Sequence, residues 1–312
     1  MEQSDQDSRR VTRRQAMQGG AGIVFGSILS AGVLGMQPDD TNTDGPGSQT
    51  EIRQTEMTHL EYDEYNSWSD MYWRSAGDRD NISLGSFPAY TDDTALQIRA
   101  QDGGHWGIDT HYEFVRGATK LSGEFNFTIG KNWRMEGREE ASCRLWNCAA
   151  SLGEGFAGGG QPDGTNGWSN RLYVTNWQTD PDGPFHLHSY TYHMDRIYDT
   201  DYIIDGERYA LAQPEIVPGE WYNFKYTVQV NTVEDGRANP DGAVTYWLDG
   251  NKIYQRSDLR FTEDLDSNII DTNGPAVHYG GQYTAPQDLY AYFEDHAMEA
   301  WSGNPRDPCS TS

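Results

Sequence analysis

Lysine is scarce in this chain of 312 residues, and basic residues of any kind are few. Lysine occurs only at Lys120, Lys131, Lys225 and Lys252, and 48 acidic residues against 23 basic ones give a formal net charge of −25. Such a charge repels a phosphate backbone, which excludes nucleic acid as an expected partner. Carboxylate-rich surfaces stay hydrated where molar salt screens charge over about 3 Å. The composition predicts a halophilic protein, such as one from an archaeon, with a mildly acidic mesophilic secreted protein as the alternative.

Cysteine is nearly absent as well. An odd count of three cannot pair completely, which excludes a disulfide framework as the main source of stability. Cys143 and Cys148 are close enough in the sequence to pair across a turn, and the sequence leaves that bridge open. A nucleophilic cysteine needs a partnering histidine. The sequence places none, so catalysis by cysteine is not expected.

No long hydrophobic run is present. The apolar stretch at residues 21–35 is too short and too rich in glycine to span about 30 Å of hydrocarbon comfortably. The pair Arg13 and Arg14 stands just before it, which indicates a twin-arginine export signal over residues 1–36. A short membrane anchor is the alternative. We therefore expect an extracellular protein, exported by the twin-arginine route, with no membrane span in its mature form.

The remaining chain is predicted to hold one domain. Residues 37–56 are rich in Asp, Thr, Gly and Pro and almost free of apolar side chains. Such a segment cannot bury enough surface to offset its ordering entropy, so we expect a flexible acidic linker. Residues 57–312 contain no second linker and are long enough for a single well-buried domain, which we expect to be monomeric.

Helical periodicity is nearly absent after residue 120, and alternating strand patterns replace it. Clear examples are residues 125–129, 172–177, 222–230 and 244–248. The last of these is followed by Asp249-Gly250, which supplies the positive φ angles of a tight hairpin turn. We therefore expect an all-β fold, a curved two-sheet antiparallel β-sandwich of the jelly-roll or concanavalin-like type, with carbohydrate on its concave face. No repeat of 20 to 50 residues stands out, which excludes a propeller or solenoid.

Two adjacent polar segments follow a glycine-rich stretch at residues 158–167. In the first, alternation places Ser169, Arg171 and Tyr173 on one face and the aliphatic Leu172 and Val174 on the other. The aliphatic face is predicted to be buried. The second segment repeats this division, with Phe185 and Leu187 buried and with a polar face made by His186, His188, Tyr190 and Tyr192.

If the two segments form a hairpin, its polar face gathers one arginine, one hydroxyl and two phenols. Such a set suits β-elimination of a uronate. A cation and hydrogen-bond donors neutralise the carboxylate and so acidify the C5 proton. A tyrosine or histidine then removes that proton, and a second phenol protonates the departing O4. The alternative is a solvated sheet face on which Tyr, His and Trp are simply good strand formers.

Several motifs of this sequence resemble those of polysaccharide lyase family 14, whose members act on alginate or glucuronan. They are Gly167-Trp168-Ser169-Asn170-Arg171-Leu172, Tyr190-Thr191-Tyr192, Gly219-Glu220-Trp221-Tyr222, Trp247-Leu248-Asp249-Gly250, Tyr279-Gly280-Gly281 and Phe293-Glu294-Asp295. The resemblance covers roughly residues 143–296 and implies a curved β-jelly roll. It further implies that Ser169 and Arg171 bind the substrate carboxylate and that Tyr190 and Tyr192 supply acid and base.

The chain departs from the family at a functional lysine. The family's K-L-P-G-L motif is represented only by Arg144-Leu145-Trp146-Asn147-Cys148, so Arg144 is the substitute that the resemblance suggests. Arginine neutralises charge but does not act as an acid or base near neutral pH. We therefore expect Arg144 to contact the substrate and not to transfer protons. We also expect contacts with the sugar from Trp168, Tyr173 and His188.

No metal or cofactor is expected. His186 and His188 could offer two ligands from one strand face, but no third ligand stands at a characteristic spacing. Two other function classes remain open. A non-catalytic carbohydrate-binding or adhesion module would use the same concave face for stacking alone. A glycoside hydrolase needs a pair of carboxylates on one strand face, and no compact pair is visible.

Overall fold

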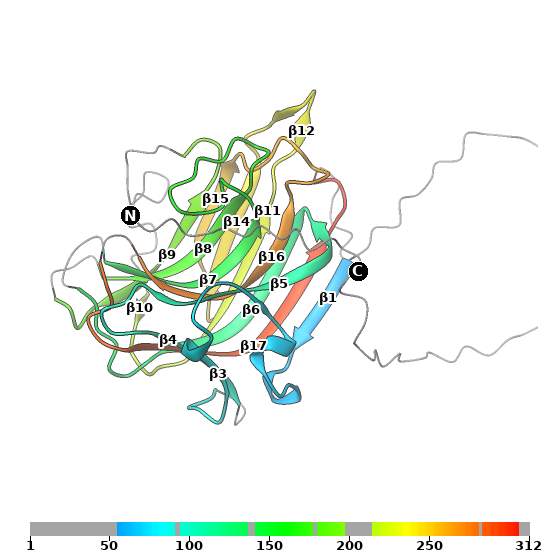
Figure 1. Ribbon diagram of the computed structural model, residues 1–312. Coiled ribbons are helices and arrows are strands. Elements are labelled where there is room, and N and C mark those ends of the chain that lie inside the picture. Colours follow the sequence, from blue (N-terminus) through cyan, green and yellow to red (C-terminus); the bar gives the residue numbers. More distant parts are fainter. Residues whose placement is uncertain are drawn as a thin grey trace, which may run out of the picture. The chain divides into compact units, whose positions relative to one another are not determined.

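The computed structural model describes residues 55–90, 94–136, 141–176, 180–196, 214–280 and 283–305 (Figure 1). The predicted export signal and most of the predicted linker lie outside these residues. The first strand, β1 (Thr55–Leu60), begins two residues inside the segment predicted as linker. Among the described residues, the only helices are the short 3-10 turns η1 (Tyr62–Glu64), η2 (Trp68–Asp70) and η3 (Arg79–Asn81), and none is long and apolar enough to cross a membrane.

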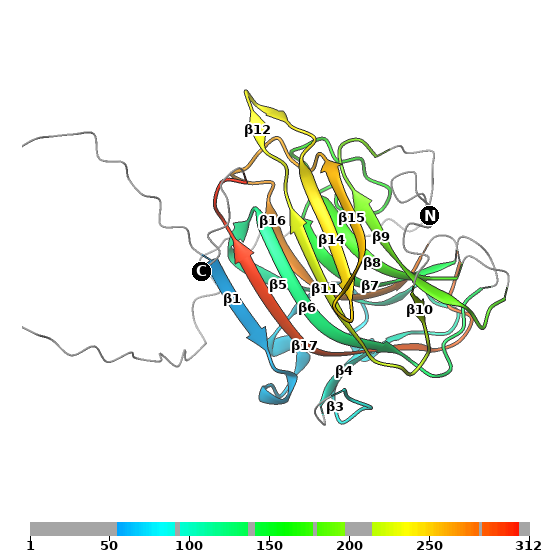
Figure 2. The same cartoon turned by 180° about the vertical axis from the view of Figure 1, so that it is seen from behind.

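Two large antiparallel sheets form the domain, which confirms the predicted β-sandwich of jelly-roll type. The eight-stranded sheet has β1 paired with β17 and otherwise runs in the order β15 (Asn251–Leu259), β14 (Gly242–Leu248), β11 (Tyr222–Gln229), β6 (Lys120–Ile129), β17 (Leu289–Trp301), β4 (Ala95–Ala100) and β3 (Ile82–Gly85). The seven-stranded sheet runs β10 (Glu215–Ile216), β9 (Phe185–Tyr192), β8 (Trp168–Thr175), β7 (Ser142–Ser151), β16 (Ile270–Tyr279), β5 (Trp106–Ala118) and β2 (Trp73–Gly77). Figure 2 shows the domain from behind, with β14, β11, β6 and β17 side by side and the small ribbon of β12 (Val233–Glu234) and β13 (Arg237–Ala238) projecting beyond them.

The core lies between the two sheets and is rich in aromatic rings. Phe125 of β6 stacks on Trp146 of β7, with ring centres 3.8 Å apart and planes 17° apart. Burying a side chain such as Phe125 stabilises the fold by about 1.5–3 kcal/mol. The four side chains predicted to be buried from alternation are all 1% exposed or less, namely Leu172, Val174, Phe185 and Leu187.

Both predicted hairpins are present. In the β14–β15 hairpin, Leu248 pairs with Asn251 across a two-residue turn, in which Asp249 and Gly250 have φ angles of 49° and 76°. These left-handed angles are those that a two-residue hairpin turn requires. In the β8–β9 hairpin, Arg171 pairs with Tyr190. The register therefore brings together the two polar faces that the alternation pattern predicts.

Cys143 and Cys148 form no disulfide bond. Both lie in the single strand β7 and not across a turn. Five extended residues span roughly 16 Å, well beyond the reach of a disulfide. Burial raises the pKa of both thiols above the ordinary value. Both are therefore inert apolar side chains of the core, and Cys309 lies outside the described residues.

Candidate active site

A pocket of about 460 Å³ opens on the face of the seven-stranded sheet that points away from the core. Its lining consists of Trp106, Ser142, Arg144, Ala157, Gly158, Gly159, Arg171, Tyr173, His188, Tyr190, Tyr192, Arg196, His278 and Gly280. Six of the eight residues predicted for the site therefore meet in one pocket. Residues 158 and 159 come from the glycine-rich stretch, which lies over the polar face of β8 and β9.

Strand pairing explains how residues far apart in the sequence reach this pocket. Tyr173 of β8 pairs with His188 of β9 on one side and with Arg144 of β7 on the other. Arg144 pairs in turn with His278 of β16, which pairs with Trp106 of β5. One row of side chains thus crosses five neighbouring strands. Such a row can follow a sugar chain that runs across the sheet.

The proposed acid–base pair lies at the β9 side of the pocket. The rings of Tyr190 and Tyr192 are perpendicular to within 7°, with centres 5.3 Å apart. The guanidinium carbon of Arg171 lies 4.8 Å from the centre of the Tyr192 ring, within range of a cation–π contact. Arg171 and Tyr192 are only 3% and 4% exposed. Both side chains are therefore enclosed, although they lie on the face of the hairpin that the sequence predicts to be polar.

Arg196 is a further member of this cluster and was not among the site residues predicted from the sequence. Its guanidinium carbon lies 3.9 Å from the centre of the Tyr192 ring. Its Nη2 donates a hydrogen bond of 2.7 Å to the hydroxyl of Tyr190. Arg196 follows β9 by four residues and belongs to no strand. No alternation pattern therefore covers it, and its proximity to Tyr192 in the sequence was the only available signal.

The environment moves the pKa values of the two phenols in opposite directions. Burial raises the pKa of Tyr192, but the guanidinium groups of Arg171 and Arg196, together with hydrogen bonds from Tyr190 and Gly159, lower it by more. The pKa therefore lies below the ordinary value of 10.0. Burial and the neighbouring Tyr192 raise the pKa of Tyr190 above that value. Two titratable groups whose pKa values are pushed apart are the pattern of an acid and a base that work together.

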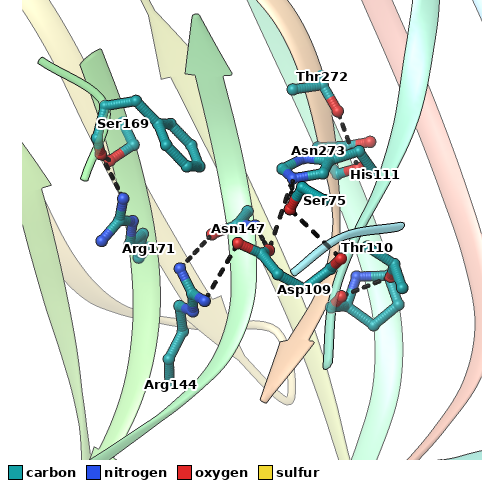
Figure 3. A network of polar contacts seen from close by, with 12 residues as sticks. Ser75, Asp109, Thr110, His111, Arg144, Asn147, Ser169, Arg171, Thr272 and Asn273 are labelled. Carbon is teal, nitrogen blue, oxygen red and sulfur yellow. Dashed lines mark hydrogen bonds and ion pairs between the residues drawn. The ribbon is translucent and has the colours of Figure 1, made fainter. Parts of the chain in front are cut away.

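Arg144 lies in a buried ion pair at the centre of the sheet (Figure 3). Its Nη2 is 3.2 Å from Oδ2 of Asp109, a β5 residue absent from the sequence-based prediction. Asn147 donates to the other carboxylate oxygen of Asp109 at 2.7 Å. Burial raises the pKa of Asp109, but Arg144 and the other partners lower it by more, so the carboxyl stays ionised. Much of the charge of Arg144 is therefore already neutralised within the protein.

The pocket histidines are uncharged. Burial lowers the pKa of His188 to about 3, and burial together with Arg144 lowers the pKa of His278 to about 3. Above that pH both imidazoles are neutral, able to donate and accept hydrogen bonds from sugar hydroxyls but not to bind a carboxylate by charge. No cluster of three or more metal-ligating side chains occurs among the described residues.

Two predicted site residues do not line the pocket. Trp168 is fully buried, packs on Phe261 with ring centres 4.4 Å apart and donates its indole N–H to Asn268, so the prediction that it contacts substrate is wrong. Alternation puts Trp168 on the core face with Leu172. Ser169 is also fully buried, and its hydroxyl donates a hydrogen bond of 2.9 Å to the carbonyl of Phe156.

Ser169 and Arg171 lie side by side in Figure 3 because both bind that same carbonyl. Phe156 belongs to the loop that precedes β8, and its ring also lies 4.8 Å from the guanidinium carbon of Arg171. No carboxylate among the described residues pairs with Arg171. Its charge therefore remains available to an anionic ligand.

Neither a protein-family model nor a curated protein matches the sequence. Among solved structures, a variant of the alginate lyase Aly36B in complex with alginate tetrasaccharide is similar, with a TM-score of 0.56, 14% identity and coverage of 78% of this chain and 96% of that one. The PL-14 alginate lyase from Aplysia kurodai is similar with a TM-score of 0.53, 19% identity and coverage of 76% and 90%. Identities this low show the fold alone, and the fold is that of these polysaccharide lyases.

Proposed function

We propose that the protein is a polysaccharide lyase, a carbon–oxygen lyase that cleaves uronate-containing polysaccharide of the alginate or glucuronan type by β-elimination. The observation that carries the proposal is the cluster of Arg171, Tyr190 and Tyr192, in which an arginine that pairs with no carboxylate of the described residues lies beside two phenols with opposite pKa shifts. This elimination needs a cation that binds the anionic sugar, a base and an acid, and the cluster offers all three. No metal or cofactor is required.

The chemical step follows from these positions. The guanidinium of Arg171 binds the uronate carboxylate and stabilises the negative charge that develops when C5 loses its proton. Tyr192, whose phenolate is favoured by two guanidinium groups, removes the C5 proton. The electron pair forms a C4–C5 double bond as the C4–O4 bond breaks. Tyr190, which keeps its proton at neutral pH, protonates the departing O4.

The rest of the pocket suits the neutral parts of a sugar chain. Tyr173 and the uncharged His188 lie in contact, with ring centres 5.2 Å apart, and present aromatic faces and hydrogen-bonding nitrogens. Trp106, which is 41% exposed, supplies a further ring on the far side. We further propose that the protein acts outside the cell as a monomer after twin-arginine export, as its N-terminal sequence indicates.

The decisive experiment incubates the protein with a panel of polyuronates in molar salt and follows the ultraviolet absorbance of the unsaturated product. We expect product from at least one polymer. Tyr192→Phe should lower the rate by ~10²–10⁴-fold while it leaves polymer affinity nearly unchanged, because the ring remains and the proton acceptor is lost. Arg171→Ala should lower the rate by ~10²-fold or more and weaken binding as well.

A second candidate function is a carbohydrate-binding or adhesion module. The ion pair of Arg144 with Asp109 favours it, because the resemblance to the lyase family expects a functional lysine where Arg144 stands. Such a module binds polymer without chemistry. It predicts that wild-type protein binds a polyuronate, that no polymer yields unsaturated product, and that Tyr192→Phe is nearly silent. That set of results would replace the lyase proposal.

A further inference from the structure

Arg196 connects the proposed acid, the proposed base and the loop above them. It stacks on the ring of Tyr192, donates to the hydroxyl of Tyr190, and donates through Nη1 to the carbonyl of Gly160 at 3.4 Å. The loop reaches back to the same pair, because the N–H of Gly159 donates to the hydroxyl of Tyr192 at 3.3 Å. Both tyrosines are thus held from above by residues that lie outside the sheet.

We propose that Arg196 is a positioning residue for β-elimination, which aims the hydroxyl hydrogen of Tyr190 at the leaving oxygen and holds Tyr192 ready to accept the C5 proton. This inference rests on the proposed function. It adds a cationic side chain that no strand pattern reveals and that acts through the two phenols without itself reacting.

The direction of the hydrogen bond between Arg196 and Tyr190 supports the proposed orientation of the Tyr190 hydroxyl. A guanidinium has only donors and stays protonated, so the hydroxyl of Tyr190 must accept the bond from Arg196. The single O–H of Tyr190 is then directed elsewhere. In the free protein the hydroxyl of Tyr192 is the neighbouring acceptor of that hydrogen. Once Tyr192 has taken up the C5 proton, a glycosidic oxygen in the pocket that Tyr190 lines can accept it instead. A phenol with no such bond would rotate its O–H freely and lose part of this alignment.

The positive charge of Arg196 supports the second part of the proposal, that Tyr192 is kept ready to accept the C5 proton. The groups that face the two phenols are Arg171 and Tyr173 from β8, Arg196 after β9, and the amide of Gly159. Among the described residues, the other titratable side chains that line the pocket are those of His188 in β9, Arg144 in β7 and His278 in β16. Arg144 is neutralised by Asp109, and both histidines are uncharged. The substrate carboxylate will partly neutralise Arg171, whereas Arg196 lies directly over the ring of Tyr192 and also lowers the pKa of that phenol.

The test compares Arg196→Met, Arg196→Lys and the control Arg134→Met, which removes an exposed arginine outside the pocket. Loss of Arg196 should lower kcat by ~10²-fold with a smaller change in KM. Loss of its charge raises the pKa of Tyr192, so the base form appears only at higher pH. The acid limb of the kcat profile should therefore move upward by about one pH unit.

Arg196→Lys should keep the wild-type pH profile, because the charge remains. It should still lose rate, because the planar contact with Tyr192 and the fixed hydrogen bond to Tyr190 are lost. Arg134→Met should match wild type both in kcat and in its pH profile. A pH profile that does not move in Arg196→Met, or an Arg196→Lys variant with full kcat, would overturn the inference. Thermal melts of each variant identify any change that comes from unfolding.

A titration without substrate separates this inference from the proposed function. Tyrosinate absorbance is followed with pH in wild type, Arg196→Met and Tyr192→Phe, and the transition missing from Tyr192→Phe identifies Tyr192. We expect that transition at higher pH in Arg196→Met. If wild type yields no unsaturated product but the transition moves, the lyase proposal fails while the electrostatic role of Arg196 stands. If the transition does not move, the inference about Arg196 fails.

Discussion

The outer faces of the two sheets differ in how far they are covered. In the eight-stranded sheet, β11 alternates strictly between buried and partly or fully exposed residues, and β6 does so over most of its length. In the seven-stranded sheet, every residue of β7 and β8 is buried. β6 and β11 therefore have a single covered face over most of their length, whereas β7 and β8 are covered on both. Alternation reports which side chains enter the core, but not what lies over the opposite face.

The outer faces of the two sheets also differ in the charged residues that they carry. The outer face of the eight-stranded sheet carries solvated pairs such as Lys225 with Glu124, which are 3.8 Å apart and about half exposed. Exposed pairs of this kind add little stability. The covered face of the seven-stranded sheet holds Arg144, Arg171 and Arg196, although the whole chain has a net charge of −25. Three of the 23 basic residues thus lie together where an anionic ligand would bind.

The largest expected effect concerns the solvated carboxylates. We predict that the protein needs molar salt to remain folded, because its unbalanced negative charges repel one another strongly in dilute buffer. The melting temperature, followed by circular dichroism, should rise steeply from dilute buffer to molar potassium chloride. A melting temperature that is the same at both salt concentrations would show that surface repulsion does not limit stability, and the halophilic interpretation would be wrong.

The next effect concerns the covered face. Asp109→Asn should destabilise the protein by about 3–5 kcal/mol, because it leaves Arg144 buried without a counter-charge. The midpoint of urea unfolding in molar salt measures the change. Replacing both partners, as Asp109→Leu with Arg144→Met, should recover much of the loss. If the single variant unfolds at the wild-type midpoint, the pair is not as desolvated as the structure indicates.

The same pair predicts a pH dependence of stability. The pKa of Asp109 is lower in the folded protein than its ordinary value of 3.8, so the unfolded chain binds the proton more tightly. The contribution of Asp109 to stability is therefore complete above about pH 5 and is lost as the pH falls toward the folded pKa. Asp109→Asn should remove this part of the acid sensitivity.

The β8–β9 hairpin could be predicted from the sequence because its information is local. Alternation assigns Leu172 to the core and Arg171 to the polar face. The register that pairs Arg171 with Tyr190 stayed open in the sequence and comes from the structure. Asp109 could not be found in this way. It reaches Arg144 only because β16 pairs with both β5 and β7, a contact that depends on the topology of the whole sheet.

Trp168 shows how a motif can override a correct local rule. Trp168 was expected to contact the sugar, whereas the alternation extended back from Leu172 puts it in the core, where the structure has it. Arg196 was missed because it lies in an irregular segment, where period-two reasoning does not apply. Local patterns therefore predicted the sheet and the centre of the candidate site, and the tertiary and loop contacts around that centre required the structure.

The smallest effect is expected for a substitution of Ser169, which we compare with a substitution of Arg171 on the same strand. The hydroxyl of Ser169 is wholly buried and donates to the carbonyl of Phe156, so Ser169→Ala should cost about 1 kcal/mol of stability, that of one hydrogen bond. Arg171 still donates to that carbonyl in the variant, so the loop should stay in place.

The effect of Ser169→Ala on catalysis should therefore be small. We expect its kcat/KM on a polyuronate to stay within roughly 10-fold of wild type, whereas Arg171→Ala loses ~10²-fold or more. Both variants are measured at one molar salt concentration and corrected for the folded fraction. The resemblance to the lyase family implies the opposite, because there the serine binds the substrate carboxylate together with the arginine. If Ser169→Ala is as damaging as Arg171→Ala, the hydroxyl must leave Phe156 when substrate binds, and the loop over β8 must open to admit the polymer.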